Sequence, residues 1–193
     1  MDFPRSACPL CGGPTQRWHG YPRHVRDDRD RLIWIPRVRC ARCGVTRALL
    51  PSFVLPRRWD AVGHVGQAAE LAATGLGHRP IALEVGRPET TVRGWLRRLR
   101  SLAMPLATTL LGRAVALGWS GFELPVAPLP RLCAAVQALA GRWPMSVAAG
   151  PWSIAVLVTG GDLLATNTDA PLAGTGTSGQ MASPSRSEVS RDP

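Results

Sequence analysis

The chain has 193 residues, which suits one ordinary domain or two small ones, and a 45% hydrophobic composition allows a buried core. All of its net charge of +10 falls in residues 1–100, where 18 arginines outnumber 8 acidic side chains. Such a basic half favours nucleic acid as the partner, with a membrane surface as the weaker alternative. The uncharged run Met145–Gly161 is interrupted by glycine and proline and falls short of the roughly 20 apolar residues that cross a bilayer, which argues against a transmembrane protein.

Two paired cysteine turns lie near the start of the chain. Cys8 and Cys11 are followed, after 28 intervening residues, by Cys40 and Cys43, and a glycine follows each pair. Four thiolates at this spacing favour a closed tetrahedral shell around one structural zinc ion, which leaves no open position for a substrate. A disulfide framework and a redox CxxC motif are the alternatives. We disfavour the first because no secretory leader precedes the cysteines, which predicts a cytoplasmic, nucleoid-associated protein, and the second because the motif is duplicated.

The segments between and after the cysteine turns are rich in β-forming residues. Strands are predicted over Thr15–Tyr21, Arg31–Arg39 and Val45–Leu50, with the charged segment His24–Arg31 as the hairpin connection. Together they predict a zinc ribbon over residues 5–56. Two tryptophans, Trp18 and Trp34, are assigned to packing within the ribbon, with base stacking as the lesser alternative.

Helical patterns begin after a proline-containing connector. Asp60 is predicted to cap a helix that runs to about Thr74, followed by a short helix over Ile81–Val85 that ends at Gly86. Pro88 is predicted to open the next helix, whose apolar stripe packs inward at helical spacing. This pattern predicts a helix-turn-helix unit within residues 57–118, including an extension helix that Pro105 is expected to kink or restart.

The outer face of the helix after Pro88 combines hydroxyl and guanidinium groups. Arginine forks grip phosphate or read guanine in the major groove, so this face is predicted to contact double-stranded DNA. A solvated amphipathic helix is the alternative. The candidate DNA contacts are Arg87, Thr90, Thr91, Arg93, Arg97 and Arg98.

The rest of the chain carries no recognisable motif. Residues 119–165 are predicted to form a proline-containing linker with short apolar helices over Leu132–Ala140 and Trp152–Val158. Residues 166–193 are dominated by small and polar residues and are predicted to be disordered. The fold class is therefore small α+β, with a zinc ribbon, a helical unit, extra helices and a tail.

The two N-terminal modules together resemble the N-terminal region of bacterial insertion-sequence transposases, and small stand-alone proteins of unknown function built on the same plan. The resemblance covers roughly residues 5–100 and rests on the CPLCG, YPRHVRD and IPRVRCARCG segments and on the pattern from Ile81 to Trp95. It implies that the four cysteines bind zinc and that the helix beginning near Pro88 reads DNA.

The chain departs from those transposases after residue 100. They continue into a nuclease domain with three metal-binding carboxylates, and two-metal chemistry needs such groups on a rigid scaffold. We find no convincing set among the acids that remain, and therefore expect a non-catalytic DNA-binding protein: a remnant, a regulator, or an accessory subunit of a separate transposase or integrase chain. A homodimer is a further expectation, and a compact transposase and a protein-interaction module are the alternatives. The remaining acids are Glu123, Asp162, Asp169, Glu188 and Asp192.

Overall fold

The computed structural model describes residues 7–121, 123–143 and 150–164. Its described part is α+β, with a three-stranded antiparallel sheet followed by five α-helices and a short 3₁₀ helix. The predicted disordered tail, residues 166–193, lies outside the described residues. The described helices include none long and apolar enough to cross a membrane.

The sheet is a long hairpin with a short third strand. β1 (Thr15–Arg26) pairs with β2 (Asp30–Cys40), and β3 (Thr46–Ala48) pairs with the end of β2. The prediction of a long connection over His24–Arg31 was wrong: the strands continue through it, and the turn occupies residues 27–29 only. Alternating β-branched residues such as Val25 and Ile33 extend the ladder into this charged segment.

Three helices follow in the order that the sequence predicts. They are α1 (Val62–Ala73), α2 (His78–Glu84) and α3 (Glu89–Ala116). Gly75 and Gly86 end α1 and α2 at φ 99° and 61°, a left-handed conformation that glycine adopts without a Cβ clash. The predicted restart at Pro105 was wrong, because α3 continues past it; its exposed position leaves the inward stripe of Ala103 and Leu106 undisturbed.

Two further helices complete the helical part. α4 (Pro128–Ala140) packs against α3, and α5 (Pro151–Val158) packs against α1 and α4, followed by the 3₁₀ helix η1 (Asp162–Leu164). Pro128 and Pro130, predicted to lie in a linker, instead occupy the first turn of α4, where a missing N–H costs little. All five helices contribute to one buried cluster, so α4 and α5 belong to the same core as α1–α3.

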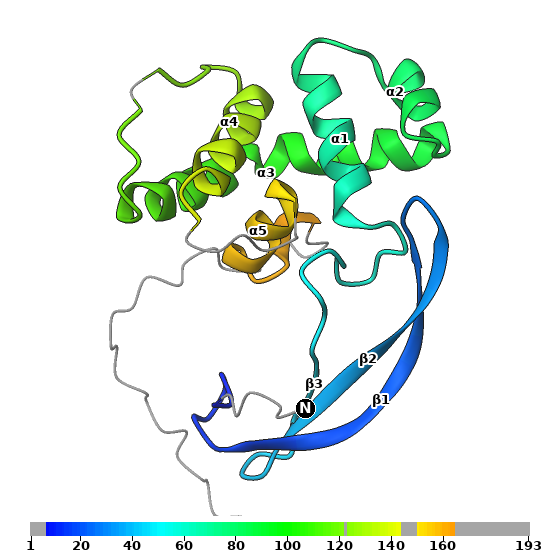
Figure 1. The fold of residues 1–193 in the computed structure, drawn as a ribbon, viewed down its shortest axis with the longest axis vertical. Helices are drawn as coiled ribbons and strands as arrows, with labels where there is room; N and C mark the ends of the chain where they lie inside the picture. The colour runs from blue at the N-terminus through cyan, green and yellow to red at the C-terminus, as the bar shows by residue number, and fades with distance from the viewer. Residues whose placement is uncertain (1–6, 122, 144–149, 165–193) are drawn as a thin grey trace, which may run out of the picture.

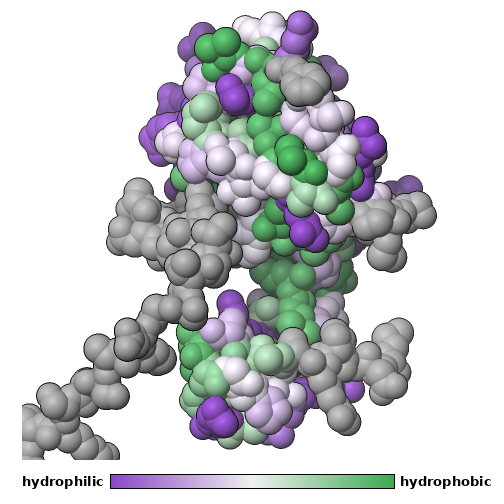
Figure 2. Space-filling view, turned by 90° about the vertical axis from the view of Figure 1, so that its left-hand side faces the viewer, coloured by the Kyte–Doolittle hydropathy of each residue, from purple (hydrophilic) through white to green (hydrophobic). Residues whose placement is uncertain are grey.

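The hairpin curves from the cysteine turns at one end to the helices at the other (Figure 1). A small separate core, Val25, Val54 and Ala61, lies where the hairpin tip meets the connector to α1. Seen from the side, the helical part and the cysteine end of the sheet form two masses joined by a narrower region (Figure 2). The cysteine turns therefore lie far from the main hydrophobic core.

Candidate functional site

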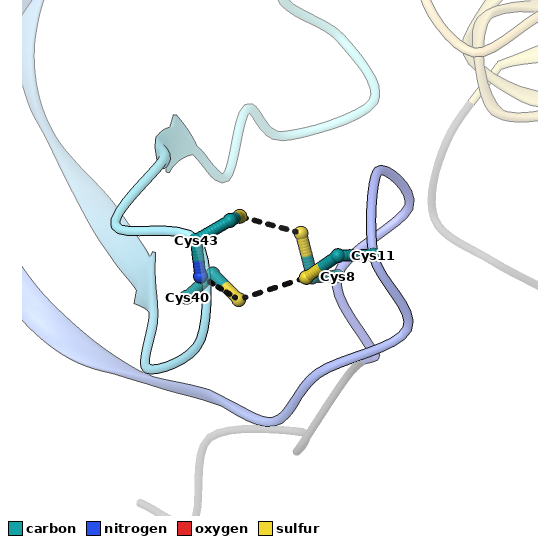
Figure 3. Close-up of side chains that lie close together, drawn as sticks. All are labelled: Cys8, Cys11, Cys40 and Cys43. Carbon is teal, nitrogen blue, oxygen red and sulfur yellow. Dashed lines mark hydrogen bonds between the residues drawn. The ribbon is translucent and has the colours of Figure 1, made fainter. Parts of the chain in front are cut away.

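The two cysteine turns face each other across a small gap at the end of the sheet (Figure 3). The Sγ atoms of Cys8 and Cys43 are 3.7 Å apart, those of Cys11 and Cys40 are 3.5 Å apart, and all four lie within 4.8 Å of one another. A tetrahedral site with metal–sulfur bonds of about 2.3 Å places sulfurs about 3.8 Å apart. The four side chains therefore fit a single bound metal ion, and the cluster fits a zinc ribbon.

Backbone hydrogen bonds fix the shape of each turn. Gly12 donates its N–H to the Cys8 carbonyl at 2.7 Å, and Gly44 donates to the Cys40 carbonyl at 3.1 Å. Both glycines have left-handed φ angles, 68° and 72°, a conformation that glycine adopts without a Cβ clash. The Cys43 N–H also donates to the Cys40 sulfur at 3.5 Å, so the turn delivers a backbone donor to a ligand atom.

A third glycine, Gly13, contributes to the site although the cysteine spacing did not indicate it. It is buried, and a Cβ at this position would lie 2.9 Å from the Arg42 Cβ and 3.3 Å from the sulfurs of Cys11 and Cys40. A larger residue would therefore push the two turns apart. The Gly-Gly pair that follows Cys11 is the signal by which the sequence could have indicated this close approach.

The sulfurs differ in their preference for the thiolate form. Backbone hydrogen bonds, chiefly from Cys43, lower the pKa of Cys40 to about 6, and backbone hydrogen bonds from Leu10 and Cys11 lower the pKa of Cys8. The Val45 backbone also favours a Cys43 thiolate, but contact with the Cys40 sulfur and desolvation raise the pKa of Cys43 to about 12. A bound cation would offset the mutual repulsion of neighbouring thiolates and allow all four sulfurs to ionise.

Five of the six candidate DNA contacts lie on the first half of α3, away from its buried stripe. Thr90, Arg93 and Arg97 are exposed, and Thr91 and Arg98 are partly exposed. Within the described part of the chain, the three arginines of this face form no ion pair with a carboxylate. The inward stripe that positions them consists of Val92, Trp95, Leu96 and Leu99, all at most 2% exposed.

Arg87 has a different environment from the other five candidates. Its Nε atom donates to the Asp60 carboxylate at 2.8 Å and its Nη2 atom donates to the Asp27 carbonyl at 3.1 Å. Asp60 also binds Arg26 of β1 at 3.1 Å, and its side chain is only 6% exposed. Arg87 thus joins the α2–α3 turn to the hairpin, and whether it also contacts DNA stays a prediction.

The predicted cap at Asp60 was wrong. Ala61 is the residue that precedes α1, no side chain caps the helix, and the Asp60 carboxylate is taken up by the two arginines instead. Charge-assisted bonds to two guanidinium groups are stronger than a single bond to a backbone N–H. This pairing was not predictable from local sequence patterns, because the two arginines lie 34 and 27 residues from Asp60 along the chain.

The acidic residues after residue 100 are not brought together by the described structure. Glu123 lies exposed in the loop between α3 and α4, and Asp162 begins η1. Asp169, Glu188 and Asp192 lie outside the described residues. Among the residues that are described, the four cysteines form the cluster able to hold a metal ion.

Comparison with known proteins finds one family model that is similar to the N-terminal part of the chain. Residues 8–95 match the family model described as Domain of unknown function (DUF6431). The match begins at Cys8 and ends at Trp95, so it spans the cysteine turns, the sheet, α1, α2 and the start of α3. No curated protein and no solved structure matches the chain.

Proposed function

We propose that this protein binds double-stranded DNA through the first half of α3, and that a zinc ion held by the four cysteines stabilises its sheet. The exposed arginine row on α3 is the observation that carries this proposal. Arg93 and Arg97 lie on the exposed face of a helix whose opposite face is packed in the core. This packing fixes the orientation of the helix and therefore the direction in which the two arginines project. Guanidinium groups held on a rigid helix suit contacts to phosphate and to guanine.

The α2–α3 pair supports a helix-turn-helix role for this face. α2 ends at Glu84, the left-handed Gly86 turns the chain, and α3 starts at Glu89. In such motifs the N-terminal part of the second helix enters the major groove. A Cβ atom built at Gly94 would have no neighbouring atom within 4 Å. Because this position has no side chain, a DNA backbone can approach the helix closely beside the arginines.

The one acid at the start of α3 does not oppose DNA binding. The Glu89 carboxylate accepts a hydrogen bond from His78 Nε2 at 2.9 Å and lies 3.5 Å from Arg79 Nε. Desolvation alone would raise the pKa of Glu89, but the His78 hydrogen bond and the charge of Arg79 outweigh it and lower that pKa. The local charge of the face therefore stays positive when Glu89 is ionised.

We infer a role related to transposition without a catalytic domain of its own, as a regulator, a remnant, or an accessory subunit of a separate transposase or integrase chain. The order of the modules supports this inference, because the cysteine cluster and the α2–α3 pair follow each other as in the transposases that the sequence resembles. A second copy of the chain is a further partner that we propose for binding to paired half-sites.

Selection from a random duplex library with the purified protein tests the DNA-binding proposal and supplies the target site. For the selected site, Arg97→Ala should weaken binding by about 5- to 150-fold if Arg97 contacts a base. Arg113→Ala is the matched control, because it removes the same charge from an exposed position at the far end of α3. No enrichment over the starting library, or equal losses for both variants, would refute the assignment of α3.

A further inference from the structure

An aromatic surface on the hairpin is not used by the proposed function. Trp34 on β2 and Trp59 on the connector are each 62% exposed, and Tyr21 on β1 is 37% exposed. The His24 ring lies nearly parallel to the Trp59 ring, with centroids 6.1 Å apart and an interplanar angle of 12°. The β1–β2 register places Trp34 on the same face of the hairpin as Pro22 and His24, whereas Tyr21 points to the other face. Exposed aromatic side chains on one surface often mark a binding site.

The connector is held firmly along the free edge of β1. Arg26 donates its N–H to the Trp59 carbonyl at 2.7 Å, and Ala61 donates its N–H to the Arg26 carbonyl at 2.8 Å. Arg23 reaches across to donate to the carbonyls of Leu55, at 2.8 Å, and Arg58. These bonds join β1 to the connector, and so hold together the two segments that line a pocket.

The pocket has a volume of about 420 Å³ and is lined by Tyr21, Pro22, Arg23, His24, Arg57 and Trp59. Its lining therefore combines aromatic rings with two guanidinium groups and includes no carboxylate. Arg57 is exposed and adopts a left-handed backbone, φ 56°, which is uncommon for a residue with a Cβ. Residues held in such conformations cluster at ligand sites.

Trp34 extends the aromatic surface beyond the pocket. It lies opposite Pro22 in the β1–β2 ladder, and its indole covers Gly20, where a Cβ would collide with it. Gly20 is thus the residue that allows this indole to lie against the strand. Trp34, Pro22 and His24 thus follow one another on one face of the hairpin, and the His24 ring stacks on Trp59.

We propose that this surface binds unpaired nucleotides of a single nucleic-acid strand, with bases stacked on Trp34 and Trp59 and phosphate bound by Arg57. Aromatic platforms next to positive charge suit single strands, because every base offers a planar face and every linkage a negative charge. A duplex buries its base faces in its own stack and cannot use this surface. The site shares no residue with α3 and does not depend on the proposed duplex contact.

Fluorescence anisotropy with labelled oligothymidine and oligouridine strands of equal length tests the proposal on the full-length protein. Trp34→Ala and Trp59→Ala should each weaken binding by about 5- to 150-fold, whereas Trp59→Phe should retain most of the affinity. Arg57→Gly should weaken binding and reduce its salt dependence, since glycine accepts the same φ angle and the substitution removes the guanidinium group. Tight binding of either strand supports the site. The strand that binds more tightly shows whether the site prefers deoxyribose or ribose.

An abasic strand with the same number of phosphates separates stacking from charge attraction. It should bind far more weakly than the thymidine strand, and Arg113→Ala should leave strand binding unchanged. The proposal is overturned if the wild-type protein binds no single strand, if the abasic strand binds equally well, or if both tryptophan variants retain wild-type affinity. The α3 variant Arg97→Ala should weaken duplex binding and leave strand binding unchanged, so failure of this proposal and failure of the proposed function are distinguishable.

Discussion

At the scale of single residues, Asp60 connects the two parts of the molecule. Its nearly buried carboxylate binds Arg26 from the hairpin and Arg87 from the α2–α3 turn, while Arg87 also binds the carbonyl of Asp27 in the hairpin turn. The hairpin and the helices are therefore held together by a small network of charges. Such a network is costly to leave half-satisfied, because Asp60 and Arg87 have given up most of their contact with water.

Replacing Asp60 by alanine should destabilise the protein by roughly 2–4 kcal/mol, since it leaves two guanidinium groups without their partner. This loss of stability is smaller than the largest losses caused by breaking fully buried ion pairs, because the Arg26 side chain is 39% exposed. Asp30→Asn is the matched control, as Asp30 is exposed, and it should change stability by less than about 0.5 kcal/mol. Urea unfolding gives the free energy of unfolding of both variants. Equal values for Asp60→Ala and Asp30→Asn would contradict the role of Asp60 in the network.

His64 should make the stability depend on pH. Burial and the charge of Arg87 lower the pKa of His64 from its ordinary value of 6.5, although Asp28 and Asp60 act in the opposite direction. The folded protein then binds fewer protons than the unfolded chain just below pH 6.5, so stability is complete above that value and falls as the pH drops through the lowered pKa. Unfolding free energies measured across this range should fall less in His64→Gln, and identical pH profiles would contradict the assignment.

At the scale of elements, the helical part is larger than a three-helix unit. α5 packs on α1 through Trp152, whose indole lies over Gly66 and donates to the Glu70 carboxylate at 2.9 Å. α4 covers α3 and joins the same buried cluster. Both later helices thus support the helix that carries the proposed DNA contacts.

Two glycines of α1 test this packing as a matched pair. Gly66→Ala should destabilise the protein by about 1–3 kcal/mol, because a Cβ there collides with the Trp152 indole. Gly63→Ala should instead stabilise it by up to about 1 kcal/mol, since nothing lies within 4 Å of its Cβ position and alanine favours the helix. Thermal unfolding distinguishes the two, and stabilisation by both substitutions would show that α5 does not pack there.

Local signals predicted the elements well, and distant contacts were not predictable. The positions of α1, α2 and the start of α3 follow from apolar spacing and from Gly75 and Gly86, which act within one turn of chain. The cysteine cluster was predictable because the CxxC spacing fixes each half of the site. The pairing of Asp60 and the packing of Trp152 on Gly66 depend on residues far apart in sequence, for which a single sequence carries no periodic signal.

At the scale of the whole molecule, the two parts are stabilised in different ways. The helices share a large buried cluster, whereas the hairpin is supported by Val25, Val54 and Ala61 at one end and by the cysteine turns at the other. A sheet with so small a core needs another source of folding free energy, and a structural metal supplies on the order of 10 kcal/mol. The cysteine end of the sheet should therefore depend on bound metal, and the helices should not.

Removal of metal should unfold the sheet and leave the helical part largely intact. Elemental analysis should find one zinc per chain, and Cys40→Ser should lower both the zinc content and the melting temperature, because three thiolates no longer close the shell. Cys133→Ala is the matched control, since Cys133 lies in α4 away from the cluster. A chelator that leaves the melting curve unchanged, or protein purified under reducing conditions without metal, would contradict a structural metal site.

The salt dependence of duplex affinity tests the proposed DNA contact most directly. With roughly five phosphates neutralised by arginines, the logarithm of the binding constant should fall against the logarithm of salt concentration with a slope of about −4 to −5. Removing Arg93 and Arg97 together should make that slope shallower by about 2 if both contact phosphate. An affinity that does not change with salt, or no measurable affinity for any duplex, would contradict the proposal that α3 binds DNA.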